Sequence, residues 1–341
     1  MKITQVKQSI VRTIRNERQV MGKNIKPWLS LDDQVSQLSS RNMIVSDIEK
    51  AKSYLSRIGY YRLSGYWYPF RKFQITGKGR QNTFLDDTEF KHIIKLYVFD
   101  KNLRLLALDA VERIEMAVRT DISYILGERD ARAHEIPKHL HGNFTKRPAY
   151  PYEKIRRGRY STKSQHHMWL DKYDQMVNRA MKQDFVSHNL EKYDYLPVWA
   201  AVEILDFRSM SMLYSGLKHE DAEKISKKYN CASKKEFETW LRSLNHIRNI
   251  VAHHARLWNA NIVDRATIPN TDIHWTVLSK NKEKPFVYFC LMQHMLKIIC
   301  PNSTWGLRLL ELLKSFPDVS NASISLQDFG YVNCEKWDLW G

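Results

Sequence analysis

The sequence predicts an all-α protein, built as a helical bundle with an N-terminal helical extension and a loop-rich insert. Apolar residues recur at spacings of three and four along most of the 341-residue chain, which is the period of an amphipathic helix. Twelve Gly and ten Pro are few for this length, and this scarcity favours long helices over a turn-rich β fold. The hydrophobic content of 43% is enough to fill the core of one large domain or two ordinary ones.

We expect three regions: a helical and aromatic region over 1–85, a helical domain over 86–315, and an aromatic C-terminal tail over 316–341. In the first region, Ser30 can cap a helix that runs to about residue 40. Ser46 and Glu49 fit a capping box, which predicts a second helix to about residue 58. The stretch 59–72 then holds six aromatic residues, which suit either core packing or a stacking platform for bases.

The longest helical signal covers residues 86–127, where Gly127 is a plausible end. Glu115 and Arg119 form an i,i+4 pair in this helix, and Glu112 lies one turn earlier. These three residues are either a stabilising surface group or a support for the polar row at 236–259 described below. The sequence does not decide between the two interpretations.

An insert at about 129–165 interrupts the helical period with Pro137, Pro148, Pro151 and Gly158. It also carries a basic run, which suits either capture of an RNA backbone or a plain solvated loop. The basic residues of this run are Lys154, Arg156, Arg157 and Arg159. Helices are expected to resume at about 166–189, after 197, at 219–229, at 284–299 and at 304–315.

The net charge of +17 and the pI near 9.6 favour a polyanionic partner, most simply nucleic acid, over a generally basic surface. The N-terminus lacks the apolar core of a signal peptide. The most apolar stretch, 286–299, is short and is interrupted by polar residues, so no membrane span is expected. The four Cys form no Cys-x-x-Cys pair and suggest no disulfide framework. We expect a cytoplasmic protein without a cofactor or a metal site.

Residues 236–259 carry the most informative pattern, a helix with two faces that Ser233 can cap. The apolar face comprises Trp240, Leu244, Ile247 and Val251, and His254 continues it. The opposite row comprises Arg242, His246, Asn249, His253 and Arg256. No acidic residue follows Glu238 in this segment, and Arg248 lies on the flank of the row.

This combination of residue types suits chemistry on a phosphodiester. An Arg guanidinium donates two parallel hydrogen bonds to phosphate oxygens, and a His can transfer a proton near neutral pH. Asn249 can orient either neighbour, and the lack of a carboxylate argues against a metal-held phosphate. The alternative is a helix C-terminus whose His and Arg complement the dipole. The spacing favours His253 over His254 as the chemical imidazole, because His253 shares a face with Asn249.

Three blocks of the chain resemble the Abi-like family, the bacterial abortive-infection proteins of the AbiD/AbiF type. They cover residues 26–70, 99–119 and 240–259. The third is the most specific and reads Trp-Leu-Arg-Ser-Leu-Asn-His-Ile-Arg-Asn, followed by Ala-His-His and Leu-Trp-Asn. The resemblance extends over nearly the whole chain, from about residue 20 to the end.

The resemblance implies a helical bundle of the HEPN type, a class of ribonucleases with an Arg-x4–6-His motif. That motif maps onto Arg248 and His253, with Asn249 as the polar residue after the Arg. The implied activity is metal-independent RNA cleavage by a homodimer, growth arrest on phage infection, and restraint by a small structured RNA. The rival hypothesis is an RNA-binding regulator without cleavage activity. A third is a nucleotidyl or adenylyl acceptor in a toxin–antitoxin pair.

Overall fold

The structure is a computed structural model that describes residues 27–75, 77, 79–146, 163–319, 321, 323–333 and 337–340. It confirms the predicted all-α class, since the described residues are mostly helical and contain one two-stranded sheet. The chain divides into two compact units, residues 1–91 and 92–341, which are described separately here. No helix within the described ranges has the length and apolarity to cross a membrane.

The described part of the first unit, from residue 27 on, contains three α-helices, a short 3-10 helix and a hairpin. The elements are α2 (Leu31–Ser40), α3 (Ile48–Ile58), α4 (Tyr60–Trp67), η1 (Tyr68–Phe70), β1 (Arg71–Phe73) and β2 (Arg80–Phe84). Ser30 caps α2 as predicted, with its side chain accepting from the Asp33 amide, and the Asp33 side chain completes a capping box. The start of α3 differs from the prediction, because the Asp47 carboxylate accepts from the Lys50 amide and caps the helix in place of Ser46.

Part of the aromatic stretch packs into the core of the first unit, whereas Tyr61 and Tyr68 are exposed. Tyr66, Trp67 and Phe70 are buried, and the Trp67 ring meets Tyr60 edge-on with centroids 4.8 Å apart. The antiparallel β1–β2 pair that follows was not predicted. Its strands have three and five residues, which is too short for an alternating pattern to be visible in the sequence.

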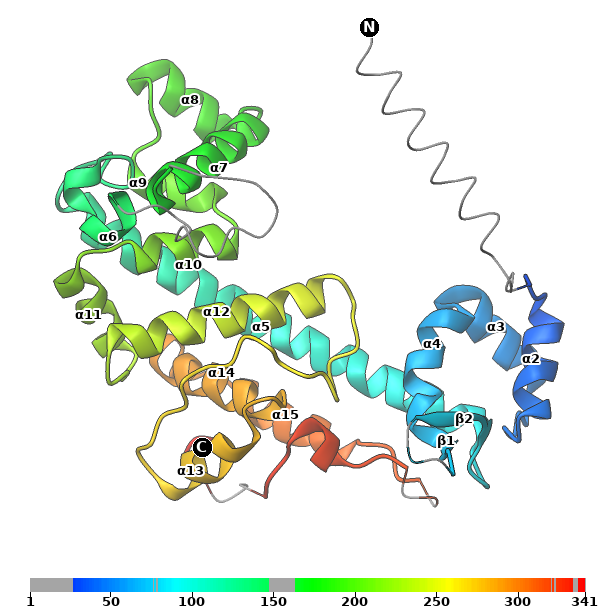
Figure 1. Cartoon of the computed structure of the whole chain (residues 1–341). Helices are drawn as coiled ribbons and strands as arrows, with labels where there is room; N and C mark the ends of the chain where they lie inside the picture. The colour runs from blue at the N-terminus through cyan, green and yellow to red at the C-terminus, as the bar shows by residue number, and fades with distance from the viewer. Residues whose placement is uncertain are drawn as a thin grey trace, which may run out of the picture. The chain divides into compact units, whose positions relative to one another are not determined.

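The second unit is a helical bundle around the 38-residue helix α5 (Phe90–Gly127), which ends at the predicted glycine (Figure 1). Its other α-helices are α6 (Gly142–Thr145), α7 (Gln165–Ala180), α8 (Asp184–Tyr193), α9 (Val198–Ala201), α10 (Phe207–Ser215), α11 (His219–Lys228), α12 (Lys234–Ala252), α13 (Ile273–Leu278), α14 (Phe286–Ile299) and α15 (Trp305–Lys314). Short 3-10 helices are η2 (Pro137–His139), η4 (Val202–Ile204), η5 (Ser279–Asn281) and η6 (Leu326–Phe329).

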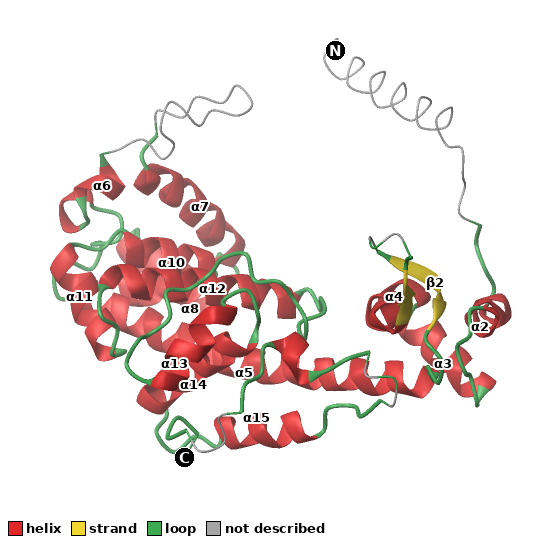
Figure 2. Ribbon diagram, turned by 60° about the horizontal axis from the view of Figure 1, so that its bottom comes forward, coloured by secondary structure: helices red, strands yellow, loops and turns green. Residues whose placement is uncertain are grey.

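Helix α12 is central to this bundle and packs against α10, α11 and α14 (Figures 1 and 2). Its predicted apolar face is buried from Trp240 to Val251. The Trp240 indole N–H donates to the Thr267 carbonyl at 2.7 Å, which ties the helix to the loop that follows it. This packing fixes which sides of α12 remain at the surface.

Helix α15 packs against α5, and the C-terminal tail packs against α14. The Trp305 indole donates to the Leu106 carbonyl of α5 at 2.8 Å. The tail lies against α14, where the Gln293 side-chain amide donates to the Leu339 carbonyl at 3.0 Å. Trp337 and Trp340 are buried, so the aromatic tail is docked, as the sequence indicated.

Candidate functional site

The candidate site lies at the C-terminal end of α12, which ends earlier than predicted. Ser233 caps the start, accepting from the Glu236 amide at 3.2 Å, as expected. The helix ends at Ala252 with His253 as its C-cap, so the prediction of one helix through residue 259 was wrong. His254 has a φ of 55° and donates its amide to the Val251 carbonyl, while the Ala255 amide reaches the Ile250 carbonyl. This pair of bonds is a Schellman motif, which normally has glycine at the left-handed position.

The predicted polar row is present as far as this turn. Arg242, Asn249 and His253 are exposed on α12. The His246 ring is half-buried and turns its Nδ1 toward the Asp264 carboxylate, 3.7 Å away. Arg256 lies beyond the end of the helix and therefore does not continue the row, contrary to the prediction.

His254 does not continue the apolar face of α12, because the left-handed turn carries it out of the helix. Its side chain is exposed, as is that of His253. Burial therefore does not distinguish the two imidazoles, and the preference for His253 rests on its place in the Arg248–His253 motif.

Arg248 lies within electrostatic reach of Glu115 on α5, which forms an ion pair with Arg119. Burial raises the pKa of the Glu115 carboxyl above its ordinary value, and the nearby guanidiniums of Arg119 and Arg248 oppose that rise. Arg119 bonds to Glu115 and to two main-chain carbonyls, Leu205 and, at 3.3 Å, Glu203. Of the three supporting candidates on α5, Glu115 lies within electrostatic reach of Arg248, and Arg119 is paired with Glu115. The other two supporting candidates are His246 and His254, which lie in α12 and just after its end, as described above.

The third supporting candidate, Glu112, is exposed and forms no ion pair with another described residue. By contrast, the Arg119 guanidinium already donates hydrogen bonds to groups on two elements. Arg248 makes no side-chain hydrogen bond within the described ranges, and neither do Asn249 and His253. The donor groups of the motif therefore remain available to a ligand.

A buried ion pair that the sequence analysis did not single out holds the segment after His253. Asp100 on α5 is fully buried and pairs with Arg104 one turn later. Its Oδ1 atom also accepts from the main-chain amides of Leu257, at 3.0 Å, and Trp258, at 2.7 Å. Asp100 and Arg104 show i,i+4 spacing in the sequence, but their partners 157 and 158 residues away are visible only in the fold.

The predicted RNA-binding residues fall into two groups. Arg242 lines a hollow of about 290 Å³ together with Lys235 and Gln165, the first residue of α7. Gln165 follows closely on the basic insert in the chain. Lys154, Arg156, Arg157 and Arg159 of that insert lie outside the described residues.

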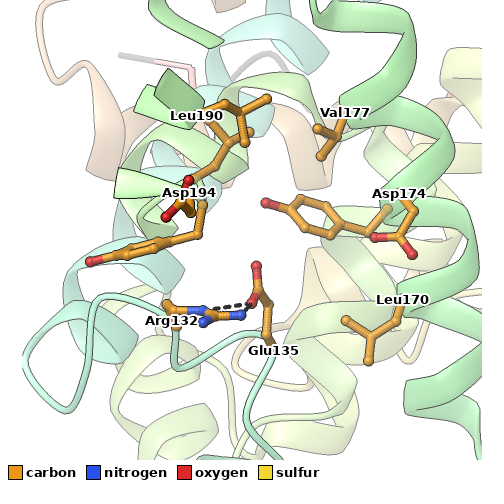
Figure 3. A pocket seen from close by; sticks show the side chains of 10 residues that line it. Arg132, Glu135, Leu170, Asp174, Val177, Leu190 and Asp194 are labelled. Carbon is orange, nitrogen blue, oxygen red and sulfur yellow. Dashed lines mark hydrogen bonds and ion pairs between the residues drawn. The ribbon is translucent and has the colours of Figure 1, made fainter. Parts of the chain in front are cut away.

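A second hollow of about 440 Å³ lies between α7 and α8 and is acidic (Figure 3). Its lining includes the carboxylates of Glu135, Asp174 and Asp194. Arg132 also lines it, but its guanidinium donates to Glu135 at 2.8 Å. A site with this charge repels phosphate, so it does not suit an RNA backbone. The residues that the structure describes include no group of three or more His, Cys, Asp or Glu that could hold a metal ion.

Comparison with known families gives one match. A family model described as Abi-like protein matches residues 53–259, which include the motif at the end of α12 and the buried pair on α5. No curated protein and no solved structure matches the chain.

Proposed function

The chain belongs to the Abi-like protein family, and from this premise we propose that it is a metal-independent endoribonuclease of the HEPN type. The observation that carries the proposal is the arrangement at the end of α12. Arg248 has an uncommitted guanidinium, and His253 is exposed five residues later at the helix C-cap. A cation for phosphate and an accessible imidazole are the minimum that cleavage of RNA needs.

In the proposed reaction the nucleophile is the 2′-hydroxyl of the RNA itself. Its oxygen attacks the adjacent phosphorus, and its proton passes to neutral His253. The bond from phosphorus to the 5′-oxygen breaks, and a second proton is delivered to that leaving oxygen. The products are a 2′,3′-cyclic phosphate and a 5′-hydroxyl. Arg248 stabilises the negative charge that develops on the phosphorane, and Asn249 orients the reacting groups.

The structure suggests different roles for the two arginines. Arg119 is held by a carboxylate and two carbonyls, so it can position the surroundings of the site but has little donor capacity left. Arg248 makes no side-chain hydrogen bond with a described residue, and the Glu115 carboxylate lies within electrostatic reach of it. We therefore assign phosphate contact to Arg248 and a positioning role to the Glu115–Arg119 pair.

Two proton transfers need two groups, and the motif supplies one imidazole per chain. In this proposal a two-fold homodimer brings two copies of the 248–253 segment to one RNA cleft. Cleavage of cellular RNA would arrest the growth of an infected cell. A small structured RNA bound to the basic surface would restrain the enzyme until infection.

The direct test is incubation of the purified full chain with total RNA in the presence of a chelator, followed by analysis of the cut ends. We expect fragments with cyclic phosphates and 5′-hydroxyls, and no cutting of an RNA whose 2′-hydroxyls are methylated. Ends carrying a 5′-phosphate, or cleavage only after a divalent metal is added, would contradict the mechanism. RNA that is bound but left intact would support the RNA-binding regulator instead.

A further inference from the structure

A third hollow, of about 450 Å³, lies where the last two turns of α5 meet α9. It is lined by Thr120, Ser123, Tyr124, Gly127, Glu128 and Trp199. We propose that it binds a nucleobase of single-stranded RNA beside the scissile phosphate. This inference rests on the proposed function, because it assigns part of the substrate to a defined subsite.

Two aromatic rings at this pocket are presented to solvent instead of the core. Trp199 is 56% exposed and Tyr124 is 80% exposed. Exposed aromatic rings are the platforms on which proteins stack unpaired bases, and they do so with little sequence preference. The two rings come from different helices, so a base between them would contact both α5 and α9.

The Trp199 ring packs against the C-terminal end of α5. A Cβ atom at position 127 would lie 3.4 Å from Cε3 of Trp199, so the indole packs directly over Gly127. The ring therefore rests against the end of α5 while more than half of its residue surface stays open. A stacking surface that is fixed before binding loses little conformational entropy when the base arrives.

The charge of the pocket selects the base over the phosphate. None of its six lining residues is basic, and Glu128 contributes a carboxylate. The hydroxyls of Thr120 and Ser123 donate to carbonyls of α5, at 3.0 and 2.9 Å. A phosphate would meet a negative charge here without a cation, whereas a base would meet ring faces and a hydrogen-bond acceptor.

The pocket is linked to the proposed catalytic group through Arg119. Ser123 follows Arg119 by one turn of α5, which is about 6 Å along the axis. On the other side, Arg119 bonds to the carbonyls of Glu203 and Leu205, in the segment that follows α9. Arg119 therefore ties the helix that carries Tyr124 to the segment that follows Trp199, and its partner Glu115 lies within electrostatic reach of Arg248. An RNA strand with its phosphate at Arg248 would place a neighbouring base at this pocket.

The test is binding of a fluorescent, fully 2′-O-methylated octanucleotide, which cannot be cleaved, to the full chain. Trp199→Ala and Tyr124→Ala should each weaken binding about tenfold or more, because loss of one stacked base costs that much. Trp199→Phe keeps a ring and should retain most of the affinity. The matched controls are Trp28→Ala and Tyr61→Ala, which remove exposed rings of the first unit and should change affinity less than twofold.

The salt dependence of binding provides a second measurement. The pocket variants should keep the wild-type slope of affinity against salt, since they lose no phosphate contact, whereas Arg248→Ala should have a shallower slope. Affinities of both pocket variants within twofold of wild type, while Arg248→Ala binds weakly, would overturn the subsite. Pocket-dependent binding together with no cleavage of unmodified RNA would support the subsite and contradict only the proposed catalysis.

Discussion

Replacement of Asp100 by Asn tests how the end of α12 is held. Asp100 is fully buried and serves three groups, the Arg104 guanidinium and the main-chain amides of Leu257 and Trp258. An Asn of the same shape can still accept from the amides, but it removes the carboxylate charge that pairs with the Arg104 guanidinium. The segment just after His253 would then be held by an amide oxygen in place of a carboxylate.

The expected cost follows from these contacts. Removal of one partner of a buried ion pair destabilises a protein by about 3–5 kcal/mol, which we expect for Asp100→Asn. Asp100→Ala also leaves two amides without acceptors, at about 1–3 kcal/mol each. That sum is comparable to the whole stability of a typical domain, about 5–15 kcal/mol, so the Ala variant is not expected to fold well. The Asn variant is therefore the informative one.

The assay is urea-induced unfolding of the full chain, followed by circular dichroism. The matched control is Asp171→Asn, which removes a surface pair with Lys163 and should cost less than about 1 kcal/mol. Adding Arg104→Met to Asp100→Asn should recover much of the lost stability, because the buried guanidinium that lost its carboxylate is then removed as well. An Asp100→Asn variant as stable as the Asp171→Asn control would refute this account of the buried pair.

Three further predictions concern stability. Burial lowers the pKa of His134 from 6.5 to about 3. As the pH falls, the unfolded chain therefore takes up this proton first, and His134 should lower the stability by about 1.4 kcal/mol per pH unit from 6.5 toward 3. His134→Asn should remove that contribution in urea titrations at several pH values. His254→Gly should raise the melting temperature, because a left-handed φ costs a non-glycine residue about 1–2 kcal/mol; an unchanged or lower melting temperature would count against strain there. Gly216→Ala should destabilise by about 1–3 kcal/mol in urea, because its methyl group would overlap the buried Phe144 ring, and a neutral effect would show that the ring can move.

The helices that the sequence predicted well share a long, regular apolar period and a local start or stop signal. Helix α5 ends at Gly127, and α12 begins after Ser233, as expected. These signals involve neighbouring residues only, so they are visible without the fold. The hairpin of the first unit was missed because its strands are too short to show a period.

The end of α12 was misjudged because its stop signal is unusual. A left-handed C-cap position normally holds Gly or Asn, and here it holds His254. The apolar residues Leu257 and Trp258 then appeared to continue the helix, but they are buried beyond the turn with their amides on Asp100. That long-range contact determines where the helix stops, and no local pattern encodes it.

The candidate residues come from the sequence, whereas their surroundings are visible only in the fold. The types and spacing of Arg248, Asn249 and His253 pointed to phosphodiester chemistry from the sequence alone. The proximity of Arg248 to Glu115 depends on how two helices far apart in the sequence pack. The pocket at Tyr124 and Trp199 likewise joins two elements, and neither residue stands out in the sequence.

The most direct test of the central claim is the RNA-cleavage rate of His253→Ala in chelator, measured beside wild type and a His188→Ala control. His188 is an exposed His on α8, away from the motif, and its loss should not change the rate. His253→Ala should lower the rate by about a hundredfold or more, with an unchanged melting temperature and near-normal binding of the methylated octanucleotide. A His253→Ala variant that cleaves RNA at the wild-type rate would contradict the account.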